Sequence, residues 1–123
     1  MKVILRTFTL QLKEQFTIAR DSYNEQETLI VELVDGPFSG LGEATAKSYY
    51  GVTIKEMITA IERVSDELES LKNVAPNDFW HQMHPNFKED MFALCALDVA
   101  YNDLYAKKQG KKLYELWELS TKN

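Results

Sequence analysis

The segment that most restricts the fold is residues 88–109, which have the pattern of a helix that is apolar in almost every direction. Gly110 suits the position just beyond a helix end, and Lys107 and Lys108 carry the charge that favours a last helical turn. The apolar residues follow one another too closely to leave a polar face: Phe92, Ala93, Leu94, Cys95, Ala96, Leu97, Val99, Ala100 and Tyr101. A helix of this kind is buried on several sides.

Residues 1–46 have the pattern of a three-stranded sheet. Residues 2–12 alternate between two faces, and residues 28–34 form a second strand in which Glu32 is the only charge. Asp35-Gly36-Pro37 is a strong turn sequence, and a third strand follows at about 39–45. The glycines of this third strand permit a bend or a close approach of another backbone. Short connections between the strands predict an antiparallel meander.

The second half of the chain has helical patterns. Residues 53–72 predict one amphipathic helix that begins with a capping box, Thr53 to Glu56. A short helix is expected at about 77–82, before His84-Pro85, and a very apolar one at about 113–119. The predicted fold is therefore α+β, a three-stranded antiparallel meander followed by a helical bundle over about 53–119, in a single domain of residues 1–123. Three strands cannot cover the helix of 88–109, so we infer that part of it faces something absent from this chain.

Composition excludes several classes of function. The chain has 123 residues, 14 Lys and Arg against 19 Asp and Glu, and a formal net charge of −5, which disfavours nucleic acid and anionic membranes as partners. It has no apolar run close to the ~20 residues of a membrane span. The single cysteine excludes an internal disulfide and favours a reducing, cytoplasmic location. A complete (β/α)8 barrel, which needs about 250 residues, does not fit this length.

Few polar residues suggest chemistry by themselves. His81 and His84 are three residues apart, but a metal site would need further ligands, and a surface or packing role is expected. Cys95 is expected to be buried in the apolar run, and Asp98 to be a hydrogen-bonded residue at a packing boundary. Glu43 is either an edge-strand carboxylate or a contact near a ligand. We assign no catalytic residue and no metal ligand to this chain.

Two connecting segments are the candidate binding loops. Residues 14–27 are too polar for the core and contain Phe16, Ile18 and Arg20, an apolar wall with one cation that can pair with a carboxylate. The alternative for Arg20 is a solvated side chain paired with a neighbouring acid. Residues 45–51 carry Tyr49 and Tyr50, which either cover the sheet or touch a substrate.

These segments resemble a known family. Phe16-Thr17-Ile18-Ala19-Arg20-Asp21-Ser22 resembles the F-x-I-A-R-x-S stretch of the dipeptide epimerases of the enolase superfamily, the L-Ala-D/L-Glu epimerases. Gly40-Leu41-Gly42-Glu43-Ala44 is similar to the G-x-G-E-[AC] strand of the superfamily. Residues 96–103 fit A-x-D-x-A-x-x-D, and Gly110 with Leu113-Tyr114 fits G-x-P-L-Y-x-L. The four pieces occur in the family's order across nearly the whole chain.

The resemblance implies a capping domain, which in such enzymes closes over the mouth of a (β/α)7β barrel. The barrel, absent here, supplies the acid/base lysines and the carboxylates that hold Mg²⁺, which stabilises the enediolate formed next to a carboxylate. The cap contributes two specificity loops, here about 15–25 and 45–53, so Arg20, Phe16, Ile18, Tyr49 and Tyr50 are the expected contacts of a dipeptide substrate. Residues 88–119 are expected to lead toward the barrel.

Two other functions fit the same pattern. One is the cap of another enolase-superfamily enzyme, similar to muconate cycloisomerase or o-succinylbenzoate synthase. The other is a stand-alone α+β interaction module that binds a partner through its apolar C-terminal helices. The chain alone is expected to be inactive, because it lacks the acid/base groups of the barrel, and to self-associate through residues 88–119, because exposed apolar patches drive association.

Overall fold

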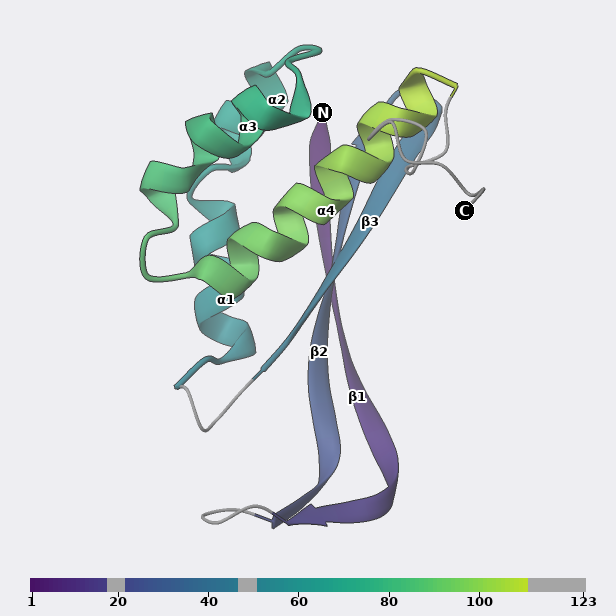
Figure 1. The fold of residues 1–123 in the computed structure, drawn as a ribbon, viewed down its shortest axis with the longest axis vertical. Coiled ribbons are helices and arrows are strands. Elements are labelled where there is room, and N and C mark those ends of the chain that lie inside the picture. Colours follow the sequence, from purple (N-terminus) through teal and green to yellow (C-terminus); the bar gives the residue numbers. More distant parts are fainter. Residues whose placement is uncertain (18–21, 47–50, 111–123) are drawn as a thin grey trace, which may run out of the picture.

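A three-stranded antiparallel sheet carries the helices of the described residues on one of its faces, and the helix expected at about 113–119 lies outside those residues (Figure 1). This computed structural model describes residues 1–17, 22–46 and 51–110, and it describes only the backbone of residues 10–17 and 22–25. The strands are β1 (Lys2–Thr17), β2 (Ser22–Asp35) and β3 (Phe38–Thr45), in the order β1-β2-β3. The helices are α1 (Ile54–Glu62), α2 (Ser65–Ser70), α3 (Pro76–Met83), the 3-10 turn η2 (His84–Asn86) and α4 (Met91–Lys108). The predicted α+β meander is confirmed.

The hairpin of β1 and β2 is longer than the sequence predicted. Residues 14–27 were expected to form a loop, but Phe16 pairs with Tyr23 and Thr17 pairs with Ser22, after an irregularity between Gln11 and Phe16. The polar composition was misleading because antiparallel pairing satisfies the backbone groups by itself and does not require an apolar face. The distal part of the hairpin extends beyond the helices (Figure 1).

The alternation in the sheet sorts its side chains between two faces. Leu29, Val31 and Leu33 of β2 are fully buried against the helices. In β1 the more apolar side faces away from them: Ile4 and Phe8 are exposed, as is Leu41 of β3. On the same outer face, Arg6 Nη1 donates to Glu32 Oε1 at 2.7 Å, which accounts for the charge that interrupts the second strand. An exposed pair of this kind contributes little to stability.

The single amphipathic helix expected over residues 53–72 is two helices. Thr53 is the N-cap of α1, and its hydroxyl accepts a hydrogen bond from the Glu56 amide at 3.1 Å, as predicted. The chain breaks after Glu62 because the Ser65 hydroxyl donates to the Glu62 carbonyl oxygen at 2.9 Å. In an unbroken helix that oxygen would accept from the amide four residues later, so the serine competes with the helix.

Helix α4 crosses the sheet and lies directly on β3. The space between them is so small that a Cβ atom built on Gly42 would lie 2.0 Å from the Ala96 carbonyl oxygen, and one on Gly40 2.1 Å from that of Ala100. The predicted close backbone approach at these two glycines is confirmed. Gly110, with φ of +68°, follows the end of α4 in the left-handed conformation that suits glycine.

Helix α3 is joined to α4 through aromatic rings. The rings of Phe79 and Tyr101 are stacked, with centroids 3.9 Å apart. The Tyr101 hydroxyl donates to the carbonyl oxygen of Val74, which precedes α3. Burial raises the pKa of Tyr101 to about 12. The core therefore runs from the inner face of β2 to the contact between α3 and α4; its largest fully buried side chains include Phe79, Phe87, Leu29, Leu33, Met57, Ile61, Leu68, Met83, Leu94, Leu97 and Leu104.

Candidate functional site

The two candidate loops arise from neighbouring positions of the sheet. Residues 18–21 and 47–50, and with them Ile18, Arg20, Tyr49 and Tyr50, lie outside the described residues. Phe16 is placed by its backbone alone, in β1 near the far end of the hairpin. The residues next to the second segment are described, and they show how its start is held to β2.

Gln26 and Glu27 hold the start of the second segment. The Gln26 side chain donates to the carbonyl oxygen of Ala46 at 2.9 Å, and the amide of Ala46 donates to the Glu27 carbonyl oxygen at 3.1 Å. Residue 46 is therefore fixed to β2 at the point where the hairpin leaves the body of the domain. Figure 1 shows that β3 ends on the side of the molecule toward which the hairpin extends. Two loops with bases tied in this way can act on one ligand.

Helix α4 presents an exposed apolar face. Met91, Phe92 and Val99 are exposed by 38%, 43% and 48%. Cys95 is also exposed, so the expectation that it is buried was wrong. The pattern of 88–109 could not show which side lies uncovered, because almost every direction is apolar. We call Met91, Phe92, Cys95 and Val99 the α4 face.

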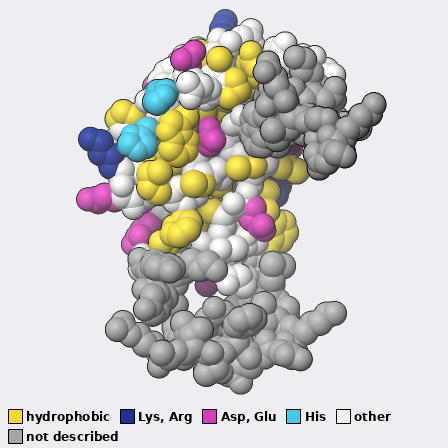
Figure 2. Space-filling model, in the orientation of Figure 1, with side chains coloured by type: hydrophobic (Ala, Val, Ile, Leu, Met, Phe, Trp, Pro, Cys, Tyr) yellow, Lys and Arg dark blue, Asp and Glu magenta, His cyan; other side chains and the backbone are white. Residues whose placement is uncertain are grey.

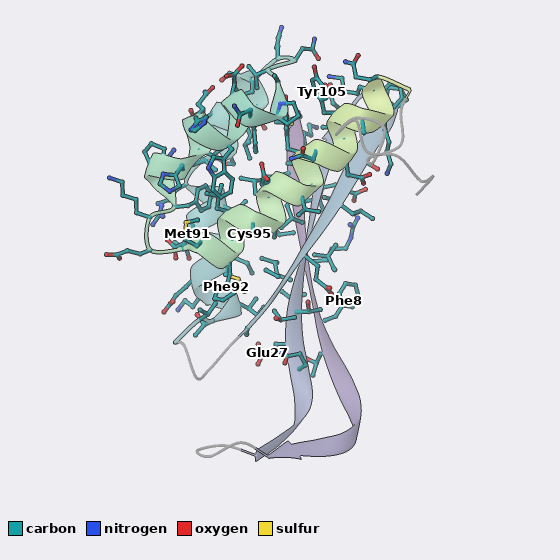
Figure 3. The ribbon with its side chains drawn as sticks, viewed as in Figure 1. Phe8, Glu27, Met91, Phe92, Cys95 and Tyr105 are labelled. Carbon is teal, nitrogen blue, oxygen red and sulfur yellow. The ribbon has the colours of Figure 1, made fainter. Side chains whose placement is uncertain are left out.

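Figures 2 and 3 show the α4 face from one direction. In the space-filling view, hydrophobic side chains gather over α3 and α4, and an acidic side chain lies among them (Figure 2). Met91, Phe92, Cys95 and Tyr105 are spread along α4, with the sheet behind the helix (Figure 3). Monomeric soluble proteins rarely expose large contiguous apolar patches, and such a patch usually marks an interaction site.

Asp98 lies beside this face and lacks a full set of partners. Its Oδ1 is buried and accepts no hydrogen bond in the part of the chain that the structure describes. Burial raises the pKa of the Asp98 carboxyl above its usual value. The Asn102 side chain donates to the backbone carbonyl oxygen of Asp98 at 2.8 Å. Asp98 is half-buried as a boundary residue should be, but the hydrogen bond expected for its carboxylate is missing at Oδ1.

The other candidate polar residues have structural partners. Glu43 lies in the edge strand β3, and its Oε2 accepts a hydrogen bond from the Thr28 hydroxyl at 3.0 Å. His84 follows the end of α3, with its ring 5.8 Å from that of Trp80, and His81 is exposed. In the described ranges, no three His, Cys, Asp or Glu residues are grouped closely enough to hold a metal ion. Within the same ranges, no helix has the length and hydropathy that crossing a bilayer requires.

The spacing of residues 96–103 has a structural explanation. Ala96 and Ala100 lie where α4 meets the two glycines of β3. Asp103 Oδ2 accepts from the Leu41 amide at 3.0 Å and from Lys107 Nζ at 3.1 Å, which ties the helix to the edge of the sheet. The packing of α4 on β3 thus accounts for three positions of the motif: the small residues Ala96 and Ala100, and the acid Asp103.

Comparison with known proteins identifies the family. Residues 1–117 match the model of the mandelate racemase/muconate lactonizing enzyme N-terminal domain. The chain therefore belongs to this N-terminal domain family of the enolase superfamily, and the resemblance inferred from its motifs is confirmed.

The relatives of this chain include epimerases and o-succinylbenzoate synthases. An L-Ala-D/L-amino acid epimerase of Flavobacterium johnsoniae is 54% identical over 121 residues, which cover 98% of this chain and 36% of that protein. The fold matches a substrate-liganded L-Ala-D/L-Glu epimerase of Bacillus subtilis with a TM-score of 0.83 at 22% identity, over 94% of this chain and 34% of that one.

A third relative was solved with its metal and a ligand. The dipeptide epimerase of Methylococcus capsulatus, complexed with Mg and the dipeptide L-Arg-D-Lys, matches with a TM-score of 0.77 at 27% identity, over 94% of this chain and 33% of that one. The chain thus spans about a third of the length of each of these relatives.

Proposed function

We propose that this chain is the substrate-specificity capping domain of a Mg²⁺-dependent dipeptide epimerase. The observation that carries the proposal is the 54% identity to the Flavobacterium johnsoniae epimerase across nearly the whole chain. The tied bases of the two candidate loops support it, because a cap must deliver both loops to one substrate.

The proposal divides the work between this chain and a catalytic domain like that of its relatives. The metal is assigned to the catalytic domain, and the similar epimerase of Methylococcus capsulatus was solved as a complex with Mg. When bound there, Mg²⁺ supplies stabilisation of the negative charge that develops as a proton leaves the carbon next to a carboxylate. This chain binds and orients the dipeptide and excludes water from it. It is inactive on its own.

Arg20 is proposed to select the second residue of the dipeptide. Its guanidinium can form a charge-assisted bond with an acidic side chain, which in a closed site contributes about 1.5–3 kcal/mol, or about ten- to hundredfold in kcat/KM. Phe16 and Ile18 form the pocket wall, with Tyr49 and Tyr50 approaching from the second loop. Truncating Phe16 or Ile18 should therefore affect acidic and apolar dipeptides alike.

The test uses a full-length enzyme that contains this cap. Residues 1–123 are joined to the catalytic part of the Flavobacterium johnsoniae epimerase in place of its own matching segment, and epimerisation is followed by proton exchange at the α-carbon. The joined enzyme should epimerise dipeptides, whereas residues 1–123 alone should not. A folded joined enzyme that epimerises no dipeptide of a broad panel would contradict the proposed function.

The role of Arg20 is read from a comparison of two substrates. Arg20→Ala should lower kcat/KM about ten- to hundredfold for a dipeptide with an acidic second residue and leave an apolar one nearly unchanged. The matched control is Arg6→Ala, which removes a cation from the outer face of the sheet, where Arg6 pairs with Glu32. Equal losses on both substrates would mean that Arg20 only holds the loop in place.

A further inference from the structure

The motif of residues 96–103 leaves one residue without a packing role in the described part of the domain. Ala96 and Ala100 allow the helix to approach β3, and Asp103 binds the Leu41 amide and Lys107. Asp98 does neither: its Oδ1 is buried and accepts no hydrogen bond from the described residues. Leaving a buried carboxylate oxygen unpaired costs free energy, so such an atom in a stable fold calls for a partner.

Asp98 and the α4 face belong to one surface. Asp98 follows Cys95 by three residues and precedes Val99, and residues three or four apart share one side of a helix. Asp98 is half-buried, and its neighbours Cys95 and Val99 are apolar and exposed. The carboxylate thus has apolar, solvent-exposed side chains on one side. A partner that covers this face would exclude the remaining water from the carboxylate.

We infer that Asp98 is the polar anchor through which the α4 face docks on the catalytic domain. The inference rests on the proposed function, because it takes the catalytic domain of such an epimerase as the occupant. The relatives supply the argument for that occupant: about two thirds of the Flavobacterium johnsoniae protein lies outside the segment that matches this chain. The docking surface of the catalytic domain should offer a hydrogen-bond donor, such as an arginine, a lysine or a backbone amide, within an apolar rim.

The anchor should have opposite effects in the separate and the joined protein. In the chain alone the buried, unpaired Oδ1 of Asp98 lowers the stability of the fold. The raised pKa of the carboxyl has the same cause, because burial disfavours the charged form. In the joined protein the same oxygen accepts a charge-assisted bond in a site without water. Removing the charge should therefore raise the stability of the separate chain or leave it unchanged. In the joined protein it should weaken the docking of α4 on the catalytic domain.

The experiment compares Asp98→Asn in two proteins. One is residues 1–123 alone, and the other is residues 1–123 joined to the catalytic part of the Flavobacterium johnsoniae epimerase. The readouts are the urea midpoint of the separate chain and the hydrogen exchange of the α4 amides in both proteins, measured at a concentration at which the separate chain is monomeric. The wild-type joined protein should protect the α4 amides more strongly than the separate chain does. Asp98→Asn should raise their exchange in the joined protein by about ten- to hundredfold, with no loss of the midpoint in the separate chain.

Two further variants complete the test. Val99→Lys places a charge in the α4 face. It should raise α4 exchange in the joined protein without lowering the urea midpoint of the separate chain, and it keeps the test decisive if Asp98→Asn does not fold. Glu69→Gln removes an exposed acid of α2, far from this face in the sequence, and should change neither readout.

Several outcomes would overturn the inference. An equal loss of stability from Asp98→Asn in both proteins would mean that its role lies within the cap. Unchanged α4 exchange in the joined variants, or wild-type α4 amides that exchange equally in both proteins, would mean that the face does not dock there. Because the readout is exchange rather than turnover, a joined protein that protects α4 but epimerises no dipeptide would refute the proposed activity and leave the anchor standing.

Discussion

Replacing Gly42 with alanine should separate α4 from β3. The added Cβ would lie 2.0 Å from the Ala96 carbonyl oxygen, 2.9 Å from the Ala96 carbonyl carbon and 3.0 Å from the Ala100 amide nitrogen. All three atoms belong to the helix backbone, so no side chain can rotate away. Real Cβ contacts are essentially never shorter than 3.0 Å, so the helix must withdraw by about 1 Å.

The cost of this withdrawal follows from what lies beneath the helix. A gap of about 0.5–1 Å loses a quarter to a half of the dispersion energy of each contact across it. Overpacked cores lose about 1–3 kcal/mol, and a backbone that cannot adapt belongs at the upper end of that range. The buried Leu97 and Leu104 share the same contact layer. We expect a loss of about 3 kcal/mol in the free energy of unfolding, which lowers the melting temperature by about 10 °C.

Gly36→Ala is the control for this prediction. Gly36 has φ of +59°, and a Cβ atom added there would have no other atom within 4 Å, so alanine meets only backbone strain of about 1–2 kcal/mol. Urea unfolding followed by circular dichroism measures both variants in residues 1–123. The argument fails if Gly42→Ala is no less stable than Gly36→Ala, because the steric term would then be absent.

Three further predictions concern pH, association and motif residues. The pKa of Tyr101 is about 12 in the folded chain and about 10 in the unfolded chain, because burial disfavours the charged form. The stability that this gives is fully present below pH 10 and is lost as the pH rises from about 10 to 12. Tyr101→Phe should weaken this loss, measured as urea midpoints across that pH range. Residues 1–123 should self-associate through the exposed α4 face, and Val99→Lys should shift the light-scattering mass toward the monomer at concentrations where the wild type associates. Asp103→Ala removes the acceptor of the Leu41 amide and should cost about 0.5–1.5 kcal/mol in urea unfolding, whereas Asp66→Ala on exposed α2 should cost less.

The sequence predicted the architecture because local patterns encode it directly. Alternation along residues 2–12 and 28–34 required strands, and the Asp35-Gly36-Pro37 turn limited them to an antiparallel pairing. Thr53 marked the start of α1 through a hydrogen bond that spans only three residues. These features depend on neighbours in the chain, and so the pattern was sufficient.

The same reasoning failed where hydropathy patterns were the only guide to which hydrogen bonds form. Within the polar segment 14–27, Phe16 and Thr17 pair with Tyr23 and Ser22, because pairing between β1 and β2 does not require apolar side chains. One serine hydroxyl at Ser65 divides a helix whose apolar periodicity is continuous. In both cases hydrogen bonds to backbone groups decided the result, and side-chain hydropathy does not report them.

For the candidate site, the sequence by itself determined the motifs and the family, since these depend on residue identity and order alone. It could not determine which side of α4 remains uncovered, because a helix apolar all round has no marked face. The tertiary structure decided that through Gly40 and Gly42, which direct Ala96 and Ala100 inward and so leave Cys95 and Val99 outward. It also decided that Asp98 has a buried, unpaired oxygen in the described chain, because hydrogen-bond partners are set by three-dimensional packing and not by sequence position.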